Sequence, residues 1–264
     1  MCAAVVTGGS QGVGRGIVEG LCEAGHRVFF TGRSEKELER TAAEASSLGG
    51  KAIPRRVDHT DDNQVEKLFS EIRDECQLEI LVNNAWGGYE NMVEDGRYTW
   101  VDPYWEQPMW RWDAMMKTGV RSAFVASQLA TKLMSEFSHG FIVNLSFWSA
   151  QKHIANVLYG MAKAATDKMT ADMAVELDDS DVSVISLYPG LVRTEKVMAF
   201  ADHLDLSNSE SPRFIGRTVA ALWANSDARK ALNGQVCVAA QVARELGVVD
   251  VDGSSPDPLS LDTA

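Results

Sequence analysis

The sequence has no apolar run approaching the roughly 18 residues that a membrane-spanning helix requires. Its N-terminus also lacks a charged region ahead of an apolar stretch, which is the pattern of a secretory signal peptide. From these two absences we expect a protein with no membrane span that works in the cytoplasm.

Cysteine and basic residues are both scarce. The cysteines show neither metal-ligand spacing nor a secreted disulfide pattern, so we expect free thiols at all four positions, Cys2, Cys22, Cys76 and Cys237. Lysine and arginine number 25 against 37 aspartates and glutamates, which gives a formal net charge of -12. This balance argues against nucleic acid or an anionic membrane as the main partner, because both attract basic proteins. No cluster of histidine, aspartate and cysteine predicts a metal site.

Short apolar segments alternate along the chain with longer helical segments. This alternation predicts βαβ units, and hence a parallel sheet with helices on both faces. We expect one Rossmann-type α/β domain with a doubly wound sheet over residues 1–252, and a polar tail over residues 253–264. Two irregular segments, 85–108 and 191–210, each follow an expected strand. Since ligands bind outside the carboxyl ends of such strands, we expect both segments to form loops over the ligand site.

A glycine-rich turn follows the first expected strand and opens the first expected helix, Thr7-Gly8-Gly9-Ser10-Gln11-Gly12-Val13-Gly14. Glycine lets the backbone approach a pyrophosphate closely, and the free N–H groups of the helix N-terminus attract the anion. The place of the turn within a βαβ unit indicates a dinucleotide site. The expected contacts are Thr7, Gly8, Ser10, Gln11, Gly12, Val13 and Gly14; the alternative is a glycine-rich loop without a ligand.

The end of the second expected strand bears on the choice of cofactor. An acidic residue there would bind the ribose 2′-hydroxyl of NAD, but the sequence reads Thr31-Gly32-Arg33-Ser34. Arg33 can bind a 2′-phosphate with paired donors, so we expect NADP(H) rather than NAD(H). The alternative is that Arg33 is simply solvated. Asp58 ends the third expected strand, where it either contacts the adenine amino group or caps the next helix.

Three residues are candidates for proton transfer. Tyr159 and Lys163 lie four positions apart on an expected helix, so their side chains share one face. A neighbouring ammonium favours the phenolate, so we expect Lys163 to lower the pKa of Tyr159 from its usual value of about 10. Ser146 ends the fifth expected strand, where its hydroxyl can orient a substrate oxygen beside Tyr159.

Together these motifs resemble the short-chain dehydrogenase/reductase family. They occur in the order and spacing of that family: Thr7–Gly14, Asn83-Asn84-Ala85, Ser146, Tyr159-Gly160-Met161-Ala162-Lys163 and Pro189-Gly190. The resemblance runs from the first strand to the last and implies a doubly wound sheet of about seven strands. It implies that Tyr159 is the general acid, that Ser146 orients the carbonyl oxygen and that Lys163 binds the nicotinamide ribose.

The resemblance also implies further contacts and an assembly. It adds expected cofactor contacts at Asn84, Ala85, Trp86, Pro189, Gly190, Val192 and Thr194. It implies a homodimer or homotetramer that pairs through the helices expected over 112–137 and 158–177. The apolar residues available for that pairing are Val120, Phe124, Leu129 and Leu133.

The chain departs from the family pattern at two positions. Trp86 stands where the family often has glycine after Asn-Asn-Ala, so it is expected to cover the cofactor or narrow the pocket. Gly119 aligns with an asparagine that helps to hold a water molecule connecting the lysine to solvent. A helix bulge with its water can persist without that side chain, so we expect reduced dependence on the relay rather than an inactive enzyme.

Aromatic residues gather near the expected catalytic group. Five tryptophans lie between positions 86 and 112, and two aromatic residues, Phe147 and Trp148, directly follow Ser146. This clustering predicts a pocket for a bulky apolar compound, lined by Trp86, Phe147 and Trp148. For Trp105, Trp110 and Trp112 the alternative is that they pack a loop onto the long helix.

The sequence therefore predicts an NADP(H)-dependent oxidoreductase that reduces a carbonyl group of a bulky, apolar or aromatic small molecule, or oxidises the matching alcohol. One alternative keeps the cofactor and changes the reaction to C=N or C=C reduction, or to a cyclisation. A second alternative is a non-catalytic sensor that binds NADP(H).

Overall fold

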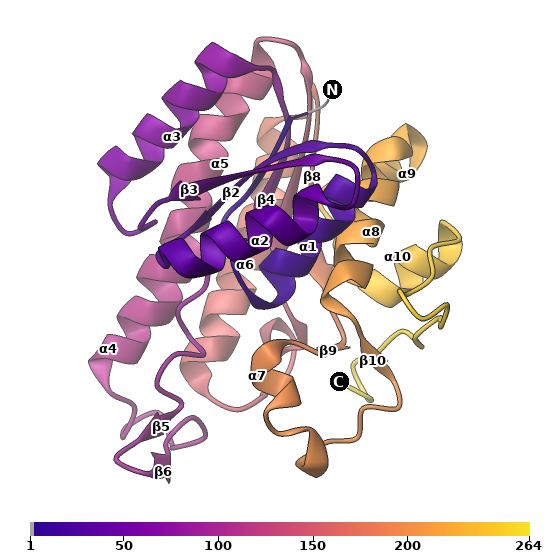
Figure 1. The fold of residues 1–264 in the computed structure, drawn as a ribbon. Helices are drawn as coiled ribbons and strands as arrows, with labels where there is room; N and C mark the ends of the chain where they lie inside the picture. Colours follow the sequence, from indigo (N-terminus) through magenta and orange to yellow (C-terminus); the bar gives the residue numbers. More distant parts are fainter. Residues whose placement is uncertain (1–2) are drawn as a thin grey trace.

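Seven parallel strands form the sheet at the centre of the molecule, in the order β11-β8-β7-β4-β1-β2-β3 (Figure 1). The computed structural model describes residues 3–264. The strands are β1 (Ala3–Val6), β2 (Arg27–Gly32), β3 (Lys51–Arg56), β4 (Leu78–Asn83), β7 (His139–Leu145), β8 (Asp181–Tyr188) and β11 (Val236–Val238). The strand order reverses between β1 and β4, where open α/β sheets bind ligands. The doubly wound Rossmann-type fold expected from the sequence is confirmed.

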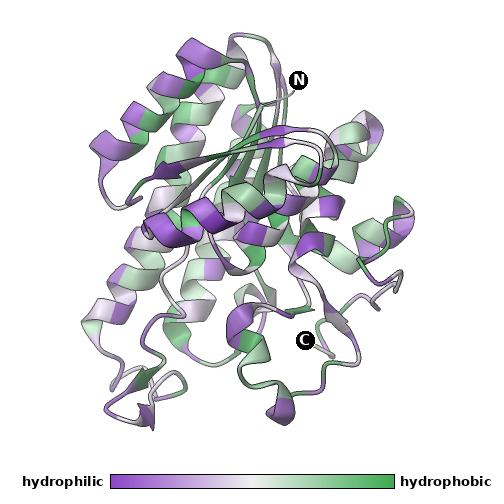
Figure 2. Ribbon diagram, in the orientation of Figure 1, coloured by the Kyte–Doolittle hydropathy of each residue, from purple (hydrophilic) through white to green (hydrophobic). Residues whose placement is uncertain are grey.

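Helices cover both faces of the sheet (Figure 1). One face packs against α1 (Gly12–Glu23), α2 (Glu35–Ser46), α8 (Pro212–Ala224) and α10 (Ala239–Glu245), with the short α9 (Ser226–Ala231) after α8. The other face packs against α3 (Asp62–Glu75), α5 (Ser122–Ser135) and α6 (Val157–Glu176). The interior strands are apolar along their length because both of their faces are covered (Figure 2).

Close packing of α1 on α8 depends on glycine. A Cβ atom at Gly16 would lie 2.0 Å from the carbonyl carbon of Pro212, and one at Gly20 would lie 2.4 Å from that of Gly216. Because neither helix backbone can move aside without opening the core, these positions exclude any side chain. The contact fixes the position of α8, the helix that follows segment 191–210 in the chain.

The helix expected over 112–137 differs from a regular α-helix in its first half. The chain forms α4 (Met109–Trp112), then the π-helical segment η1 (Asp113–Arg121), and then α5. π-helical turns are rare and occur mostly at functional sites. The bulge that we expected to persist around Gly119 is therefore present, and Gly119 itself is buried.

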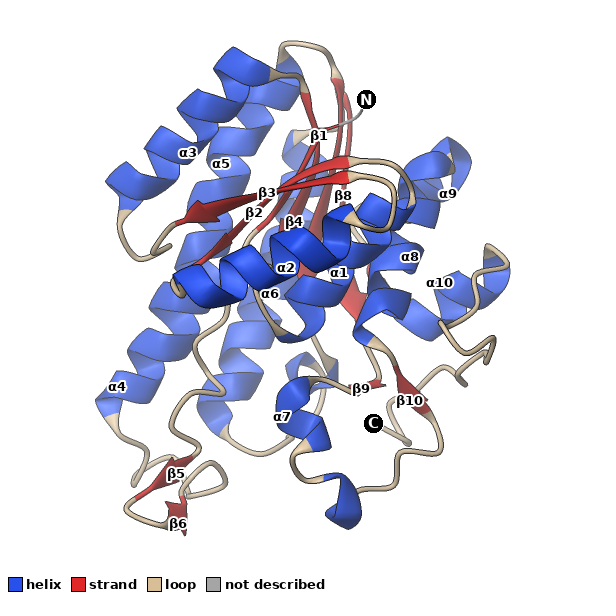
Figure 3. Ribbon diagram, in the orientation of Figure 1, coloured by secondary structure: helices blue, strands red, loops and turns tan. Residues whose placement is uncertain are grey.

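The two segments expected to be loops contain short elements beyond the carboxyl ends of the strands (Figure 3). Segment 85–108 forms a hairpin of β5 (Val93–Glu94) and β6 (Arg97–Tyr98). Segment 191–210 contains β9 (Leu191–Val192), α7 (Glu195–Met198), the 3-10 turn η3 (Ala201–His203) and β10 (Ser209–Glu210). Another 3-10 turn, η2 (Trp148–Ala150), precedes α6.

Residues 253–264 have no helix or strand but make defined hydrogen bonds. Lys152 Nζ donates to the Leu261 carbonyl at 2.8 Å, and Arg244 pairs with Asp257 at 2.8 Å. Over residues 3–264, no helix is long and apolar enough to cross a bilayer, and no three His, Cys, Asp or Glu side chains group as metal ligands. The described cysteines, Cys22, Cys76 and Cys237, are free; Cys2 lies outside the described residues.

Candidate active site

The glycine-rich turn between β1 and α1 is held in shape by its neighbours. Gly8 N donates to Thr31 Oγ1 at 3.0 Å, and Gly9 N donates to the Thr31 carbonyl at 2.8 Å. Gly8 and Gly12 have φ angles of 64° and 56°, a backbone conformation that favours glycine. The turn therefore presents the N-terminus of α1 to the carboxyl edge of the sheet, as an anion-binding site requires.

Asn84 ties the end of β4 to this turn. Its Nδ2 donates to the carbonyls of Thr7 at 3.0 Å and Gly8 at 2.9 Å, while Thr7 Oγ1 accepts from Asn84 N and Ala85 N. A Cβ atom at Gly14 would lie 2.3 Å from Asn84 Nδ2, so only glycine leaves room for this amide. Asn84 therefore acts through its contacts with the turn.

A carboxylate already occupies the anion position at the start of α1. Glu195 accepts from Gly12 N at 3.0 Å and from Arg15 Nη1 at 3.1 Å, and Arg40 lies 3.7 Å away. The contact shows that Gly12 N and Arg15 bind a carboxylate oxygen at the N-terminus of α1, where an anion is favoured. Glu195 was not predicted from the sequence, because nothing in its local pattern indicates a contact with a residue more than 180 positions earlier.

The other residues of the turn that were expected to contact the cofactor are Ser10, Gln11 and Val13. The Ser10 carbonyl accepts from Thr41 Oγ1 at 3.1 Å, Gln11 is the N-cap residue of α1 without a side-chain cap bond, and Val13 packs against the core. Gln11 is exposed, so its side chain remains available for a cofactor contact.

Arg33 and Asp58 lie at the ends of β2 and β3. The Arg33 guanidinium is 61% exposed and pairs with Glu90 of segment 85–108. Asp58 Oδ1 accepts from Thr60 N at 2.9 Å and Thr60 Oγ1 at 2.8 Å, and these bonds hold the pKa of Asp58 below its usual range. The cap of α3 is Asp61, so the capping alternative for Asp58 is wrong.

Tyr159 lies on the first turn of α6, with its ring enclosed by aromatic side chains. Asn156 caps this turn, and its Oδ1 accepts from Tyr159 N at 2.9 Å. The Tyr159 ring centroid lies 5.6 to 6.3 Å from those of four other rings, Trp86, Tyr89, Trp100 and Phe147. The hydroxyl oxygens of Tyr159 and Tyr89 are 2.8 Å apart. Tyr89 and Trp100 were not assigned to the pocket from the sequence, because only the folded loop brings them to Tyr159.

The acidity of Tyr159 differs from the sequence expectation. Burial, together with the neighbouring Tyr89, raises the pKa of Tyr159 well above its usual value. We expected Lys163 to lower it, but the Lys163 ammonium lies 6.0 Å from the Tyr159 ring centroid and donates instead to the Leu145 carbonyl at 3.0 Å. In this arrangement Tyr159 is a protonated acid, because desolvation of the phenolate outweighs the distant positive charge.

Lys163 is buried beside the rings of Trp86 and Tyr159. Burial lowers its pKa to about 8, although the carboxylate of Asp167 acts in the opposite direction. Its Nζ lies 4.1 Å from the centroid of the Trp86 indole. Ser146 directly follows β7, and its Oγ donates to the Lys163 carbonyl at 3.3 Å. The structure thus brings the three predicted catalytic residues together at the junction of β7 and α6.

Phe147 and Trp148, the two aromatic residues after Ser146, pack against different parts of the structure. Phe147 stacks on Tyr159 with ring centroids 6.3 Å apart. Trp148 instead packs edge-on against Tyr188 at 5.3 Å, and Tyr188 donates its hydroxyl to Asp167. Trp105 is 72% exposed, so it neither lines the pocket nor fills the core.

The segment after β8 reaches the glycine-rich turn. Pro189 and Gly190 follow Tyr188, and Gly190 N donates to Glu210 Oε2 at 2.8 Å. Burial raises the pKa of Glu210 to about 7. Val192 is buried on β9, and Thr194 caps α7 while its Cγ2 lies 3.6 Å from where a Cβ of Gly12 would be.

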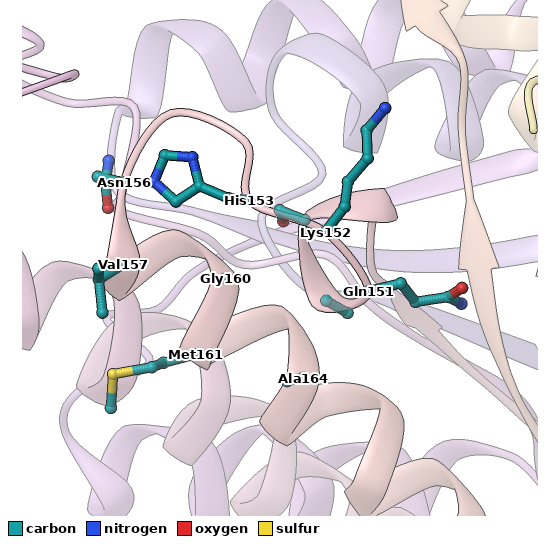
Figure 4. Close-up of a pocket in the computed structure, with 10 residues that line it drawn as sticks. Gln151, Lys152, His153, Asn156, Val157, Gly160, Met161 and Ala164 are labelled. Atoms are coloured by element: carbon teal, nitrogen blue, oxygen red, sulfur yellow. The ribbon is translucent and has the colours of Figure 1, made fainter. Parts of the chain in front are cut away.

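A separate depression of about 350 Å³ lies beside η2 and the start of α6 (Figure 4). Val157, Met161 and Ala164 line it, and helical spacing places them away from the face that carries Tyr159 and Lys163. This depression is therefore not the site built around Tyr159.

Comparison with known proteins places this arrangement in a family. A sequence model described as short chain dehydrogenase matches residues 2–205. Dehydrogenase/reductase SDR family member 1 is 38% identical in Mus musculus, covering 94% of this chain and 83% of that protein, and 37% identical in Homo sapiens, covering 97% and 86%.

Solved structures agree with this match. A short-chain type dehydrogenase/reductase from Mycobacterium marinum gives a TM-score of 0.76 at 27% identity, covering 90% of this chain and 93% of that chain. A structure from Beutenbergia cavernae with NADP bound at low occupancy gives 0.75 at 25% identity, covering 90% and 94%. From the matched sequence, the seven-stranded sheet and the grouped Ser146, Tyr159 and Lys163, the chain belongs to the short-chain dehydrogenase/reductase family and is an oxidoreductase.

Proposed function

We propose that this protein is an NADP(H)-dependent oxidoreductase that reduces a carbonyl group of a bulky, apolar or ring-containing small molecule, or oxidises the matching alcohol. The observation that carries the proposal is the Tyr159 hydroxyl, which is buried among aromatic rings with a raised pKa. A group of this kind retains its proton at neutral pH and can donate it in a site from which water is excluded.

Residues at two ends of the site support NADP(H) as the cofactor. The donors of Gly12 and Arg15 already bind a carboxylate, so they fit a pyrophosphate oxygen. Arg33, 61% exposed, follows the end of β2, at the position where an acidic residue would bind the ribose 2′-hydroxyl of NAD. An arginine at this position favours a ribose that carries a 2′-phosphate. The Arg33–Glu90 pair is exposed and therefore easily exchanged for a phosphate.

The reaction divides between cofactor and protein. When bound, NADP(H) supplies the hydride to the carbonyl carbon. Tyr159 donates the proton of its hydroxyl to the carbonyl oxygen, and Ser146, whose bond to the Lys163 carbonyl is long at 3.3 Å, reorients its hydroxyl toward the same oxygen. The Lys163 ammonium stabilises the phenolate that Tyr159 becomes, and it would hold the nicotinamide ribose of a bound cofactor through its remaining N–H groups.

The pH dependence of each direction follows from the same environment. Alcohol oxidation requires Tyr159 to accept a proton as the phenolate, and burial disfavours that form. We therefore expect the rate of alcohol oxidation to increase as the pH rises, whereas at neutral pH Tyr159 already carries the proton that carbonyl reduction needs.

The aromatic rings around Tyr159 support the proposed substrate class. Trp86, Trp100 and Phe147 provide apolar ring surface, and the exposed Tyr89 lies at the solvent side of the group. A carbonyl oxygen must come within hydrogen-bond distance of the Tyr159 hydroxyl, where the Tyr89 hydroxyl now lies at 2.8 Å. Substrate entry therefore displaces Tyr89, and a bulky ring system replaces the contacts that Tyr89 gives up.

We also propose that the protein forms a homodimer or homotetramer through α5 and α6. Phe124 and Val175 are exposed on these helices, at 53% and 77%. Leu129 and Leu133, which we had assigned to the same pairing, instead pack against the core beside the sheet. Sedimentation of the purified protein, with Val175→Glu as the disruptive variant, tests this assembly.

Replacing Tyr159 by phenylalanine tests the proposed reaction. Tyr159→Phe removes only the acidic hydroxyl, so turnover should fall about 1,000-fold while the dissociation constant for NADPH stays nearly unchanged. Tyr98→Phe, on the exposed hairpin, is the matched control and should retain full activity. Equal activity of Tyr159→Phe and the unmodified enzyme would refute the mechanism, and a product reduced at C=N or C=C would redirect the substrate class.

A further inference from the structure

The Trp86 indole lies between two glycines that leave it no spare room. A Cβ atom at Gly119 would lie 2.6 Å from the indole atoms Cε3 and Cζ3. A Cβ atom at Gly88 would lie 2.7 Å from Nε1, Cε2 and Cζ2 of the same ring. Real Cβ atoms do not approach other heavy atoms so closely, so each glycine is required as long as the indole has this position.

The indole placed in this way faces the ammonium of Lys163. The Nζ atom lies 4.1 Å from the ring centroid, within the range of a cation–π interaction. The hydrogen bond of this ammonium is to the Leu145 carbonyl at 3.0 Å. Backbone and indole together therefore fix the position of Nζ between β7 and η1.

We propose that Trp86 is the positioning residue for the Lys163 ammonium, and that Gly119 lacks a side chain because the indole occupies that volume. The two departures from the family pattern, a large residue at 86 and none at 119, are then one exchange rather than two losses. The ring contributes negative electrostatic potential to the ammonium but has no lone pair on its face, so it stabilises the charge without accepting its proton.

The charge on Lys163 depends on few other groups. The Asp167 carboxylate on α6 favours the ammonium, and the hydroxyls facing this region belong to Tyr159 on α6, Tyr89 of the loop and Tyr188 on β8. Burial lowers the pKa of Lys163 to about 8 even though Asp167 acts in the opposite direction, so removal of the ring should lower this pKa further.

A double-mutant cycle in thermal unfolding tests the steric part. With Trp86 present, Gly119→Ala should lower the melting temperature, because the new methyl group meets the indole. In a Trp86→Gly background the same change should be neutral or stabilising, because alanine is the better helix former. Gly160→Ala on α6 is the control: its Cβ would meet only the Ser149 carbonyl, at 3.0 Å, so its effect should be equal in both backgrounds.

A lysine titration by NMR tests the electrostatic part. In cofactor-free protein with labelled lysine, with the Lys163 signal assigned from Lys163→Met, Trp86→Leu should lower the Lys163 pKa by about one unit, a tenfold change in the protonation equilibrium. Trp86→Phe keeps an aromatic face and should restore most of the shift. Trp105→Leu, at an exposed tryptophan, should leave the pKa unchanged.

The catalytic meaning of this positioning rests on the proposed function, but both measurements are made without cofactor or substrate. If coupling between positions 86 and 119 and the Lys163 shift are found in a protein without reductase activity, the proposed function fails and the positioning role stands. If Gly119→Ala has the same effect in both backgrounds, or if Trp86→Leu leaves the Lys163 pKa unchanged, the positioning role is overturned.

Discussion

Glu195 should weaken cofactor binding, because its carboxylate uses the donors that the cofactor needs. It accepts from Gly12 N at 3.0 Å and from Arg15 Nη1 at 3.1 Å. A pyrophosphate at the N-terminus of α1 requires the same two groups. Glu195→Gln keeps the shape of the side chain and removes its charge, so we expect NADPH to bind more tightly to this variant.

The size of the effect follows from the exposure of the contact. The Glu195 side chain is 49% exposed, and an ion pair at such a position contributes about 0.2 to 1 kcal/mol. Its bond to an N-terminal backbone N–H resembles a helix cap, which contributes about 1 kcal/mol. Glu195→Gln removes the ion pair and about half of the cap-like bond, because an amide oxygen can still accept from Gly12 N. The relief of about 0.7 to 1.5 kcal/mol corresponds to binding that is about 3 to 13 times tighter.

Titration of the protein with NADPH, followed by fluorescence, measures this change. Glu44→Gln is the matched control, because Glu44 also pairs with Arg15 but makes no bond to Gly12 N, and its effect should stay within about twofold. The advantage of Glu195→Gln should shrink as salt is raised, since screening weakens the original contact. Unchanged or weaker NADPH binding by Glu195→Gln would refute the competition.

Three further predictions concern the same site. Arg33→Ser should weaken NADPH binding about tenfold and leave NADH binding unchanged, because only the 2′-phosphate uses the guanidinium; equal losses for both cofactors would contradict its role. Tyr89→Phe should lower KM up to about fivefold with little change in kcat, since substrate no longer breaks a hydrogen bond to enter; a loss as large as in Tyr159→Phe would make Tyr89 a proton donor. Burial lowers the pKa of Lys163 to about 8, whereas the pKa of Tyr159 is raised. We therefore expect kcat/KM for reduction to be constant below pH 8 and to fall above pH 8 as the ammonium loses its proton. If kcat/KM stayed constant for one further pH unit above 8, this assignment would be contradicted.

Local patterns in the sequence are sufficient to predict much of this structure. Alternating strands and helices fix the sheet because buried parallel strands need continuous apolar runs, as in β1 and β4. The glycine-rich turn and the Tyr159–Lys163 spacing are equally local, since one depends on backbone conformation and the other on helix periodicity.

Features that depend on contacts between distant segments were not predictable in this way. The carboxylate of Glu195 reaches Gly12 only because segment 191–210 folds back over α1. The raised pKa of Tyr159 results from burial by Tyr89 and Trp100, whereas the sequence shows only that Lys163 is near along the helix. A pattern of residue types carries no information on how far a side chain is desolvated.

The end of the chain shows a different kind of omission. No helix was expected after residue 210, although Ser211 and Pro212 form a typical helix start and Ser211 Oγ caps α8.

The most direct test of the proposed reaction is nicotinamide absorbance during turnover, with NADPH and NADH compared over a panel of bulky ketones, aldehydes, quinones and cyclic imines. Consumption of NADPH in preference to NADH, with a carbonyl compound reduced to its alcohol and the activity lost in Tyr159→Phe, is the predicted result. Tight NADPH binding without turnover of any compound, or turnover that persists in Tyr159→Phe, would contradict it.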